Sequence, residues 1–319
     1  MDALTQSVGQ LQIGSSRDSS QNRLDNVPRF VFRVVSPDSD GKTDETWACS
    51  EAAMQGNTQA QQDALSVIEQ DEREKVARAL NVHLWWMKKA NPMDNFVSWT
   101  SSLPFAIQYV FYRHLNDKRP LEEIKLFVID TTQFRQGTFI RDLNLIEEFQ
   151  HDNPLYCERT LPKLWEWRTG NLYFGEYLSQ GSLGIAGKCQ VISLKASADD
   201  DSLFTLQPRF SDTCRMPPGK KRPEWVYPVL NLRKEIFSDT PLKTRGREDM
   251  ADRMKAVLNI ANRFEPGWKL PMAVYFAALI CKRLQSSDEL MLLECFATGP
   301  FSGLSTPILP MQQISEYPS

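Results

Sequence analysis

Hydrophobic positions follow two different periods between residues 27 and 206, which predicts a mixture of strands and helices. Aromatic and β-branched residues fill 28–35, and a nearly continuous apolar run fills 124–130. Short runs of this kind are typical of strands, and the second run predicts a strand that is buried on both faces. Within 62–90, apolar residues recur at helical spacing instead, which predicts a long helix.

Cap and turn residues add further elements to this pattern. A short strand is expected at 96–100, and either Ser101 or Ser102 can cap a following helix that tolerates Pro104 in its first turn. Two later segments, 173–178 and 189–194, also have the composition of strands. These elements together predict the α+β fold class.

The distribution of polar and apolar residues divides the chain into five parts. Residues 1–26 are rich in Ser, Gln, Asn and Asp, and we expect a disordered tail there. Residues 27–206 form the α+β domain, and the polar, proline-rich span 207–244 is expected to be a linker. Helical periodicity returns in 245–299, which predicts a small all-α module packed on the first domain, and 300–319 is expected to be a second tail.

Composition narrows the function classes. Hydrophobic residues make up 41% of the chain, charged residues 24%, and the net charge is −3, so we expect a packed core and no nucleic-acid partner. There is no N-terminal signal pattern and no run of about 18 apolar residues, so we expect a cytoplasmic protein with no membrane partner. The six cysteines form no CxxC pair and none lies near one of the three histidines in sequence, so we predict no metal site.

Three segments carry candidate chemistry because of their order along the chain. The first expected strand contains Arg33. The strand at 96–100 contains Ser98 and Thr100, and a third strand contains Glu176, which a glycine turn follows. Each residue alone is more often an ordinary ion-pair, strand or surface residue.

Taken together, this order resembles the Arg…Ser-x-Ser/Thr…Glu signature of ADP-ribosyltransferases of the cholera-toxin and heat-labile-enterotoxin type. Arg33 corresponds to the strand arginine, Ser98 and Thr100 to the serine motif, and Glu176 to the catalytic glutamate. The phrases Phe-Val-Ser-Trp-Thr-Ser-Ser-Leu-Pro-Phe-Ala and Gly-Glu-Tyr-Leu-Ser-Gln-Gly look like a largely uncharacterised fungal group with such a domain. The resemblance covers about 170 residues and implies an ADP-ribosyltransferase-like split β-sheet core with flanking helices.

The resemblance also implies a reaction and a role for each residue. NAD is the implied substrate, and the activity is that of a mono-ADP-ribosyltransferase or an NAD glycohydrolase. Cleavage of the nicotinamide–ribose bond builds positive charge on the ribose, which the Glu176 carboxylate would stabilise. Arg33 would bind phosphate or ribose oxygens of the dinucleotide. Ser98 would orient Glu176 or the ribose, and Thr100 would support the strand.

Two positions depart from the family pattern. Arginine-modifying members carry a second acid two residues before the glutamate, where this chain has Phe174. This argues against arginine as acceptor and leaves another macromolecule or water. The middle residue of the serine motif is Trp99, where the family usually has something smaller; an inward-pointing indole would narrow the nicotinamide pocket, and an outward-pointing one would not.

Three hypotheses therefore stand side by side. The first is an active NAD-dependent enzyme, and the second is a catalytically degenerate member that binds a nucleotide or a protein. The third is an interaction scaffold of another fold, in which Arg33, Ser98 and Glu176 would be scattered.

Other conspicuous residues have structural interpretations. We expect Trp85, Trp86, Trp165 and Trp167 to pack in the core or between segments. Asp130 ends the buried strand, where a carboxylate can cap a turn.

Overall fold

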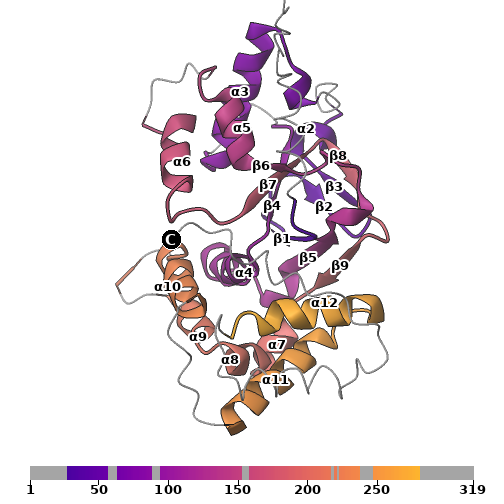
Figure 1. The fold of residues 1–319 in the computed structure, drawn as a ribbon, viewed down its shortest axis with the longest axis vertical. Helices are drawn as coiled ribbons and strands as arrows, with labels where there is room; N and C mark the ends of the chain where they lie inside the picture. Colours follow the sequence, from indigo (N-terminus) through magenta and orange to yellow (C-terminus); the bar gives the residue numbers. More distant parts are fainter. Residues whose placement is uncertain are drawn as a thin grey trace, which may run out of the picture.

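The computed structural model describes residues 27–56, 63–87, 94–152, 158–216, 219–220, 223–237 and 247–280. These residues form a mixed α+β structure with antiparallel sheets (Figure 1). The strands are β1 (Phe30–Val35), β2 (Lys42–Thr43), β3 (Trp47–Cys49), β4 (Phe96–Thr100), β5 (Lys125–Asp130), β6 (Ile140–Arg141), β7 (Glu176–Gln180), β8 (Ser182–Gly184) and β9 (Cys189–Ile192). The α-helices are α2 (Glu51–Met54), α3 (Gln70–Leu84), α4 (Leu103–Asp117), α5 (Asp142–Phe149), α6 (Leu161–Arg168), α7 (Lys195–Asp199), α8 (Ser202–Leu206), α9 (Phe210–Thr213), α10 (Val226–Ile236), α11 (Arg247–Ala261) and α12 (Pro266–Ala277).

Two sheets organise the molecule. The larger has six strands in the order β6-β7-β4-β1-β5-β9, and the smaller has three in the order β2-β3-β8. All strand pairs are antiparallel. The buried strand expected at 124–130 is β5, which lies between β1 and β9 and is buried from Leu126 to Asp130.

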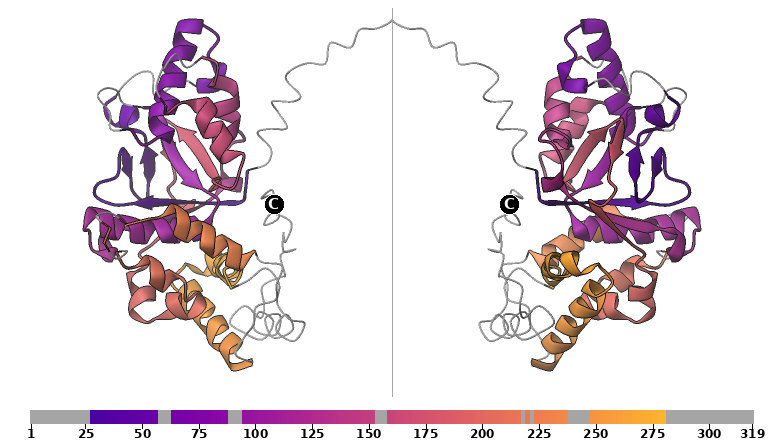
Figure 2. Two further views of the ribbon diagram at one scale, coloured as in Figure 1. Left: turned by 90° about the vertical axis from the view of Figure 1, so that its left-hand side faces the viewer. Right: turned by 90° about the vertical axis from the view of Figure 1, so that its right-hand side faces the viewer.

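Alternation along the strands divides the buried residues into clusters on opposite faces of the large sheet. On one face, Val31 and Trp99 pack with residues of the small sheet such as Ala48. On the other face, Phe32 packs with α4 and the C-terminal helices, whereas Phe96 packs with α3, α5 and α6. The two side views show these helical groups at opposite ends of the molecule (Figure 2).

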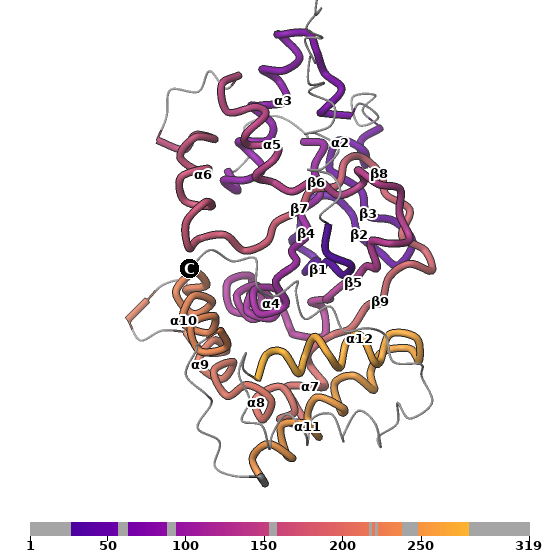
Figure 3. Tube along the Cα trace, viewed as in Figure 1, coloured from indigo at the N-terminus to yellow at the C-terminus, as the bar shows by residue number. Residues whose placement is uncertain are grey.

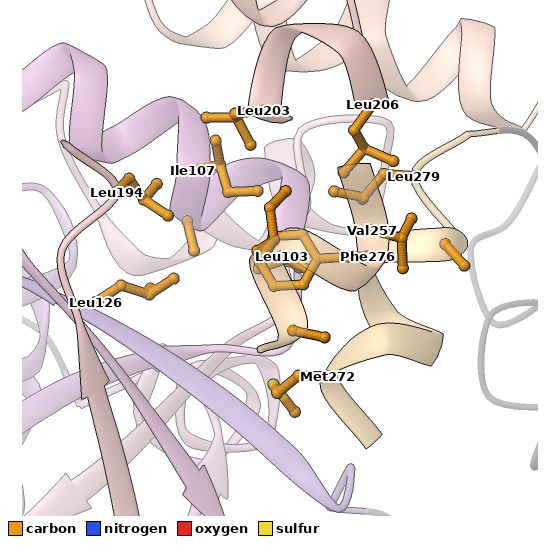
Figure 4. Packing of buried hydrophobic residues seen from close by; sticks show 14 of the residues in the cluster. Leu103, Ile107, Leu126, Leu194, Leu203, Leu206, Val257, Met272, Phe276 and Leu279 are labelled. Carbon is orange, nitrogen blue, oxygen red and sulfur yellow. The ribbon is translucent and has the colours of Figure 1, made fainter. Parts of the chain in front are cut away.

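The C-terminal helices share one hydrophobic core with the large sheet. Leu103 and Ile107 of α4 and Leu126 of β5 lie in the same cluster as Met272 and Phe276 of α12 (Figure 4). The predicted all-α module is thus represented by α11 and α12, whose apolar side chains pack directly against the sheet domain. The part of the predicted module beyond residue 280 and the tails expected at 1–26 and 300–319 lie outside the described residues.

The span expected to be a linker, 207–244, contains helices α9 and α10. Phe210, Val229 and Leu232 are buried in it. The linker prediction was wrong for α10 because it relied on the proline-rich composition and overlooked the apolar spacing. That spacing brings Val229, Leu232 and Ile236 onto one side of the helix.

Two element boundaries differ from the sequence expectation. The strand expected at 173–178 begins only at Glu176, because Gly175 has a φ of 67° and breaks the extended backbone before it. The chain between α6 and β7 is a connecting segment (Figure 3). The long helix within 62–90 is α3; it ends at Leu84, and Trp86 beyond it takes the left-handed conformation.

The structural interpretations of the tryptophans and of Asp130 are confirmed for the most part. The ring of Trp85 contacts that of Trp167, and Trp165 packs against the cluster under α3 and α5. The Asp130 carboxylate accepts the backbone N–H of Thr132, so it caps the turn after β5. Trp86 and Trp167 are 49% and 42% exposed, and the Trp86 ring packs between segments against the rings of Tyr109 and Trp225.

Among the helices that the structure describes, none combines the length and the apolar composition that spanning a membrane requires.

Candidate functional site

The sequence-predicted residues lie on three neighbouring strands of the large sheet. The strands β7, β4 and β1 are adjacent in that order. Thr100 lies opposite Glu176 on β7 and opposite Phe32 on β1. Opposed residues of antiparallel strands share a face, so Ser98, Thr100 and Glu176 project to the same side. Helices pack on that side of the sheet. Along β4, Ser98 lies between Phe96, which packs with α3, α5 and α6, and Thr100, which lies opposite Phe32 of the cluster around α4.

Arg33 lies where strands β1 and β4 stop pairing. The two strands share a single residue pair, whereas β4 and β7 pair along five residues. The Arg33 guanidinium donates from Nη1 to the Ser98 carbonyl oxygen at 2.9 Å and from Nε to the Thr43 hydroxyl at 3.1 Å. Burial lowers the pKa of Arg33 to about 10, against the attraction of the Asp40 and Asp94 carboxylates, so the group stays charged at neutral pH.

Ser98 and Glu176 are in direct contact. The Ser98 hydroxyl lies 2.7 Å from Glu176 Oε1, and the Glu176 side chain is 16% exposed. Arg33 therefore touches the main chain of Ser98, while the side chain of Ser98 touches Glu176. Arg33 follows Phe32 on β1, so its side chain starts from the opposite face and reaches Thr43 of the small sheet. Ser98 links the two other residues, since Arg33 contacts its carbonyl oxygen and Glu176 contacts its hydroxyl.

The second oxygen of Glu176 is held by an arginine that the sequence pattern did not indicate. Arg168, the last residue of α6, donates from Nη1 to Glu176 Oε2 at 2.7 Å and also to Asp142 Oδ2 at the start of α5. Burial lowers the pKa of Arg168, but the charges of Glu176 and Asp142 outweigh it and raise that pKa overall. Two carboxylates thus share one guanidinium.

Asp142 is the most buried charged group of the site, with no exposed surface. Its Oδ1 atom has no hydrogen-bond partner among the described residues. Burial raises the pKa of Asp142 from 3.8 to about 6; the charge of Arg168 opposes this shift and that of Glu176 adds to it.

A histidine and a second aspartate complete the hydrogen-bonded chain on the other side of Ser98. His83 of α3 places Nε2 at 2.7 Å from the Ser98 hydroxyl, and its Nδ1 lies 3.1 Å from Asp94 Oδ2. The side chains of His83 and Asp94 are 15% and 5% exposed. The chain therefore runs Asp94–His83–Ser98–Glu176–Arg168 and ends at Asp142.

Thr100 and its neighbours fix the backbone before Glu176. The Thr100 hydroxyl donates to the Phe174 carbonyl oxygen at 2.6 Å, and the Ser101 N–H donates to the Gly175 carbonyl oxygen at 2.8 Å. Gly175 has positive φ, and a Cβ there would overlap the Ser101 hydroxyl. Thr100 thus helps to fix the backbone before Glu176, and Gly175 is the residue that permits the close approach.

Phe174 and Trp99 are both held by packing contacts in the structure. The Phe174 ring stacks on Phe105 at a centroid distance of 5.3 Å and contacts Trp225 at the same distance, so this position is committed to packing. Trp99 is 1% exposed and lies on the opposite face from Ser98, where its indole N–H donates to the Ser179 hydroxyl at 2.9 Å. It therefore points away from Glu176.

Sequence reasoning missed four members of this group: His83, Asp94, Asp142 and Arg168. The available signals were weak, because His83 is one of three histidines in the chain and acidic residues and arginines are common. Within the part of the chain that the structure describes, no cluster of three or more His, Cys, Asp or Glu side chains is arranged to hold a metal ion.

Residues 26–183 match a protein family described as a domain of unknown function (DUF7587). Comparisons with curated proteins and with solved structures found no match. The matched segment is just under half of the chain. It contains all the residues of the candidate site, from Arg33 to Glu176, whereas helices α7 to α12 lie beyond it. The site therefore lies wholly within the segment that is similar to this family.

Proposed function

We propose that this chain binds NAD and cleaves its nicotinamide–ribose bond, with an acceptor other than arginine. The proposal rests on one observation. Arg33, Ser98 and Glu176 lie on three adjacent strands and are joined by hydrogen bonds through Ser98, and they follow the chain order of the Arg…Ser-x-Thr…Glu pattern. A scaffold of unrelated fold gives no reason for these three residues to meet. The α+β sheet with helices on one face and a small sheet on the other is also compatible with an ADP-ribosyltransferase-like core.

Each residue has a role that follows from its chemistry. Departure of nicotinamide leaves positive charge on the ribose, and the Glu176 carboxylate, held in place by Ser98 and Arg168, stabilises that charge without reorganising. Arg33 keeps its charge at neutral pH and binds oxygens of the phosphates or ribose. The acceptor, a macromolecule or water, then takes the ADP-ribosyl group. Phe174 stands where an arginine-modifying enzyme needs an acid, so a guanidinium is not the acceptor.

One observation favours a second candidate, a binding protein without turnover. Both oxygens of Glu176 already have partners, and Arg168 offsets its charge. A carboxylate that is neutralised by an internal guanidinium stabilises a nearby cation less well. In this case Arg33 still anchors a nucleotide, but the bond is not cleaved.

Nicotinamide release and NAD binding separate the two candidates. The proposal predicts release by the wild type, loss of at least about a hundredfold in rate for Glu176→Gln with NAD binding retained, and weaker binding for Arg33→Lys. Binding that needs Arg33, with no release by any variant, would establish the binding protein. Absence of both binding and release by the folded wild type would refute both candidates.

A further inference from the structure

The hydrogen-bonded chain behind Glu176 requires a particular number of protons. The Ser98 hydroxyl carries one hydrogen, yet two strong partners, His83 Nε2 and Glu176 Oε1, each lie 2.7 Å from its oxygen. Only one of them can receive that hydrogen. The other contact is a hydrogen bond only if the partner itself supplies a proton.

The backbone N–H of Phe96 donates to Asp94 Oδ1 at 3.0 Å, which favours the ionised form of this carboxylate. With Asp94 ionised, two arrangements satisfy both contacts of the Ser98 hydroxyl. In the first, Ser98 donates to Glu176 and accepts a proton from His83 Nε2. The Nδ1 atom must then also carry a proton, because the Asp94 carboxylate beside it can only accept, and His83 is an imidazolium. In the second, Ser98 donates to a neutral His83 and Glu176 is protonated. Each arrangement therefore holds one proton more than the pair formed by a neutral His83 and an ionised Glu176.

The surrounding charges favour the first arrangement. Arg168 donates to the second oxygen of Glu176, which stabilises the ionised carboxylate. With His83 as imidazolium, charges along the chain alternate in sign from Asp94 through His83, Glu176 and Arg168 to Asp142. Further charges act on the ends of this chain: Arg33, itself near Asp40 and Arg113, acts on Asp94, and Arg141 acts on Asp142. The only ring that contacts His83 is that of Phe96, at 5.8 Å between centroids among the described residues.

We infer that His83 is a positioning residue for Glu176: held as an imidazolium by Asp94, it directs the Ser98 hydroxyl toward the Glu176 carboxylate. Loss of the imidazolium proton turns that hydroxyl toward Nε2 and leaves two unprotonated oxygens, Ser98 Oγ and Glu176 Oε1, in contact. Glu176 then loses the partner that fixes it. The protonation state of His83 stands on the hydrogen-bond geometry alone, whereas its effect on turnover rests on the proposed function.

Nitrogen-15 NMR of the histidine-labelled full chain tests the protonation state without any ligand. His83 is assigned by comparison with His83→Gln, since the chain has only His114 and His151 besides. At pH 7 the wild type is expected to show both His83 ring nitrogens protonated. The isosteric Asp94→Asn variant is expected to show one protonated nitrogen at the same pH. A wild-type His83 with a single protonated nitrogen at pH 7, unchanged in Asp94→Asn, would overturn the inference.

Nicotinamide release then tests the positioning role. Asp94→Asn is expected to lower kcat about tenfold at pH 8 and much less at pH 6, with KM within about twofold. His114→Gln is the matched control, because His114 lies at the end of α4 with Nδ1 near the Arg119 carbonyl oxygen, and it is expected to leave the pH profile unchanged. An equal loss at both pH values would mean a purely structural role and would contradict the inference. If the wild type releases no nicotinamide, the proposed function fails, and the NMR result still decides the state of His83.

Discussion

Gly175 is the residue whose backbone most directly sets the position of Glu176. Its φ of 67° is strained for any other residue, and an added Cβ would also displace the Ser101 hydroxyl. Gly175→Ala is therefore expected to lower the free energy of unfolding by roughly 2–4 kcal/mol, measured by chemical denaturation.

Gly187 provides the matched control for this substitution. It has a φ of 72°, but a Cβ there meets no atom within 4 Å. Gly187→Ala is expected to cost only the conformational part, about 1–2 kcal/mol. Equal costs at the two glycines would show that the close approach to Ser101 is unimportant.

Asp142 gives the site a characteristic pH dependence of stability. Its pKa is raised by burial to about 6 in the folded protein from 3.8, so the folded state holds this proton more tightly than the unfolded state. The stability contributed by the protonated form is complete below about pH 4 and is lost as pH rises through about 6. Replacement of Asp142 by Asn removes this loss. The stability of Asp142→Asn relative to the wild type is expected to rise between pH 4 and pH 7 by up to roughly 3 kcal/mol.

Urea denaturation at several pH values measures this difference. Glu248→Gln, an exposed change on α11, is expected to leave the pH dependence as it is in the wild type. A constant difference between Asp142→Asn and the wild type from pH 4 to pH 7 would contradict the assigned pKa direction.

Among the elements, the pairing of β4 with β7 positions the site residues. One buried hydrogen bond joins these two strands on the opposite face of the sheet. The Trp99 indole donates to Ser179, which is 1% exposed. Ser179→Ala leaves that N–H buried without a partner, so it is expected to destabilise the fold by about 1–3 kcal/mol. Ser182→Ala, at an exposed position of β8, is the control and is expected to change stability by less than about 0.5 kcal/mol. A Ser179→Ala effect no larger than that of the control would mean that the indole N–H finds another acceptor.

The sequence predicted most of these helices and strands but not which of them pack together. The strands at 28–35, 96–100 and 124–130 and the helix capped by Ser102 follow from local patterns, and the structure confirms them. The late start of β7 escaped prediction because an aromatic segment before Gly175 has strand-like composition. It is committed instead to ring stacking.

The candidate site shows the same division. Arg33, Ser98 and Glu176 could be proposed from order along the chain. His83, Arg168 and Asp142 could not, because they come from α3, α6 and α5. The approach of these helices to β4 and β7 depends on the packing of one apolar cluster. Local periodicity carries no information about that packing.

At the scale of the whole molecule, the C-terminal helices belong to the core of the sheet domain. Phe276 of α12 is fully buried in the cluster that also holds Phe32 and Leu126. Phe276→Ala is expected to cost about 3–5 kcal/mol and to increase hydrogen exchange in β1 and β5 as well as in α12. Tyr227→Ala, at a residue that is 68% exposed on α10, is expected to change little. Faster exchange confined to α11 and α12 would contradict a shared core.

We propose Glu176 as the residue that promotes cleavage of NAD. Nicotinamide release at saturating NAD by the wild type, Glu176→Gln and the exposed control Glu248→Gln tests it most directly. The wild type and Glu248→Gln are expected to release nicotinamide, and a folded Glu176→Gln is expected to do so at a rate at least about a hundredfold lower. Equal rates for the wild type and Glu176→Gln, or no release by a folded wild type, would contradict it.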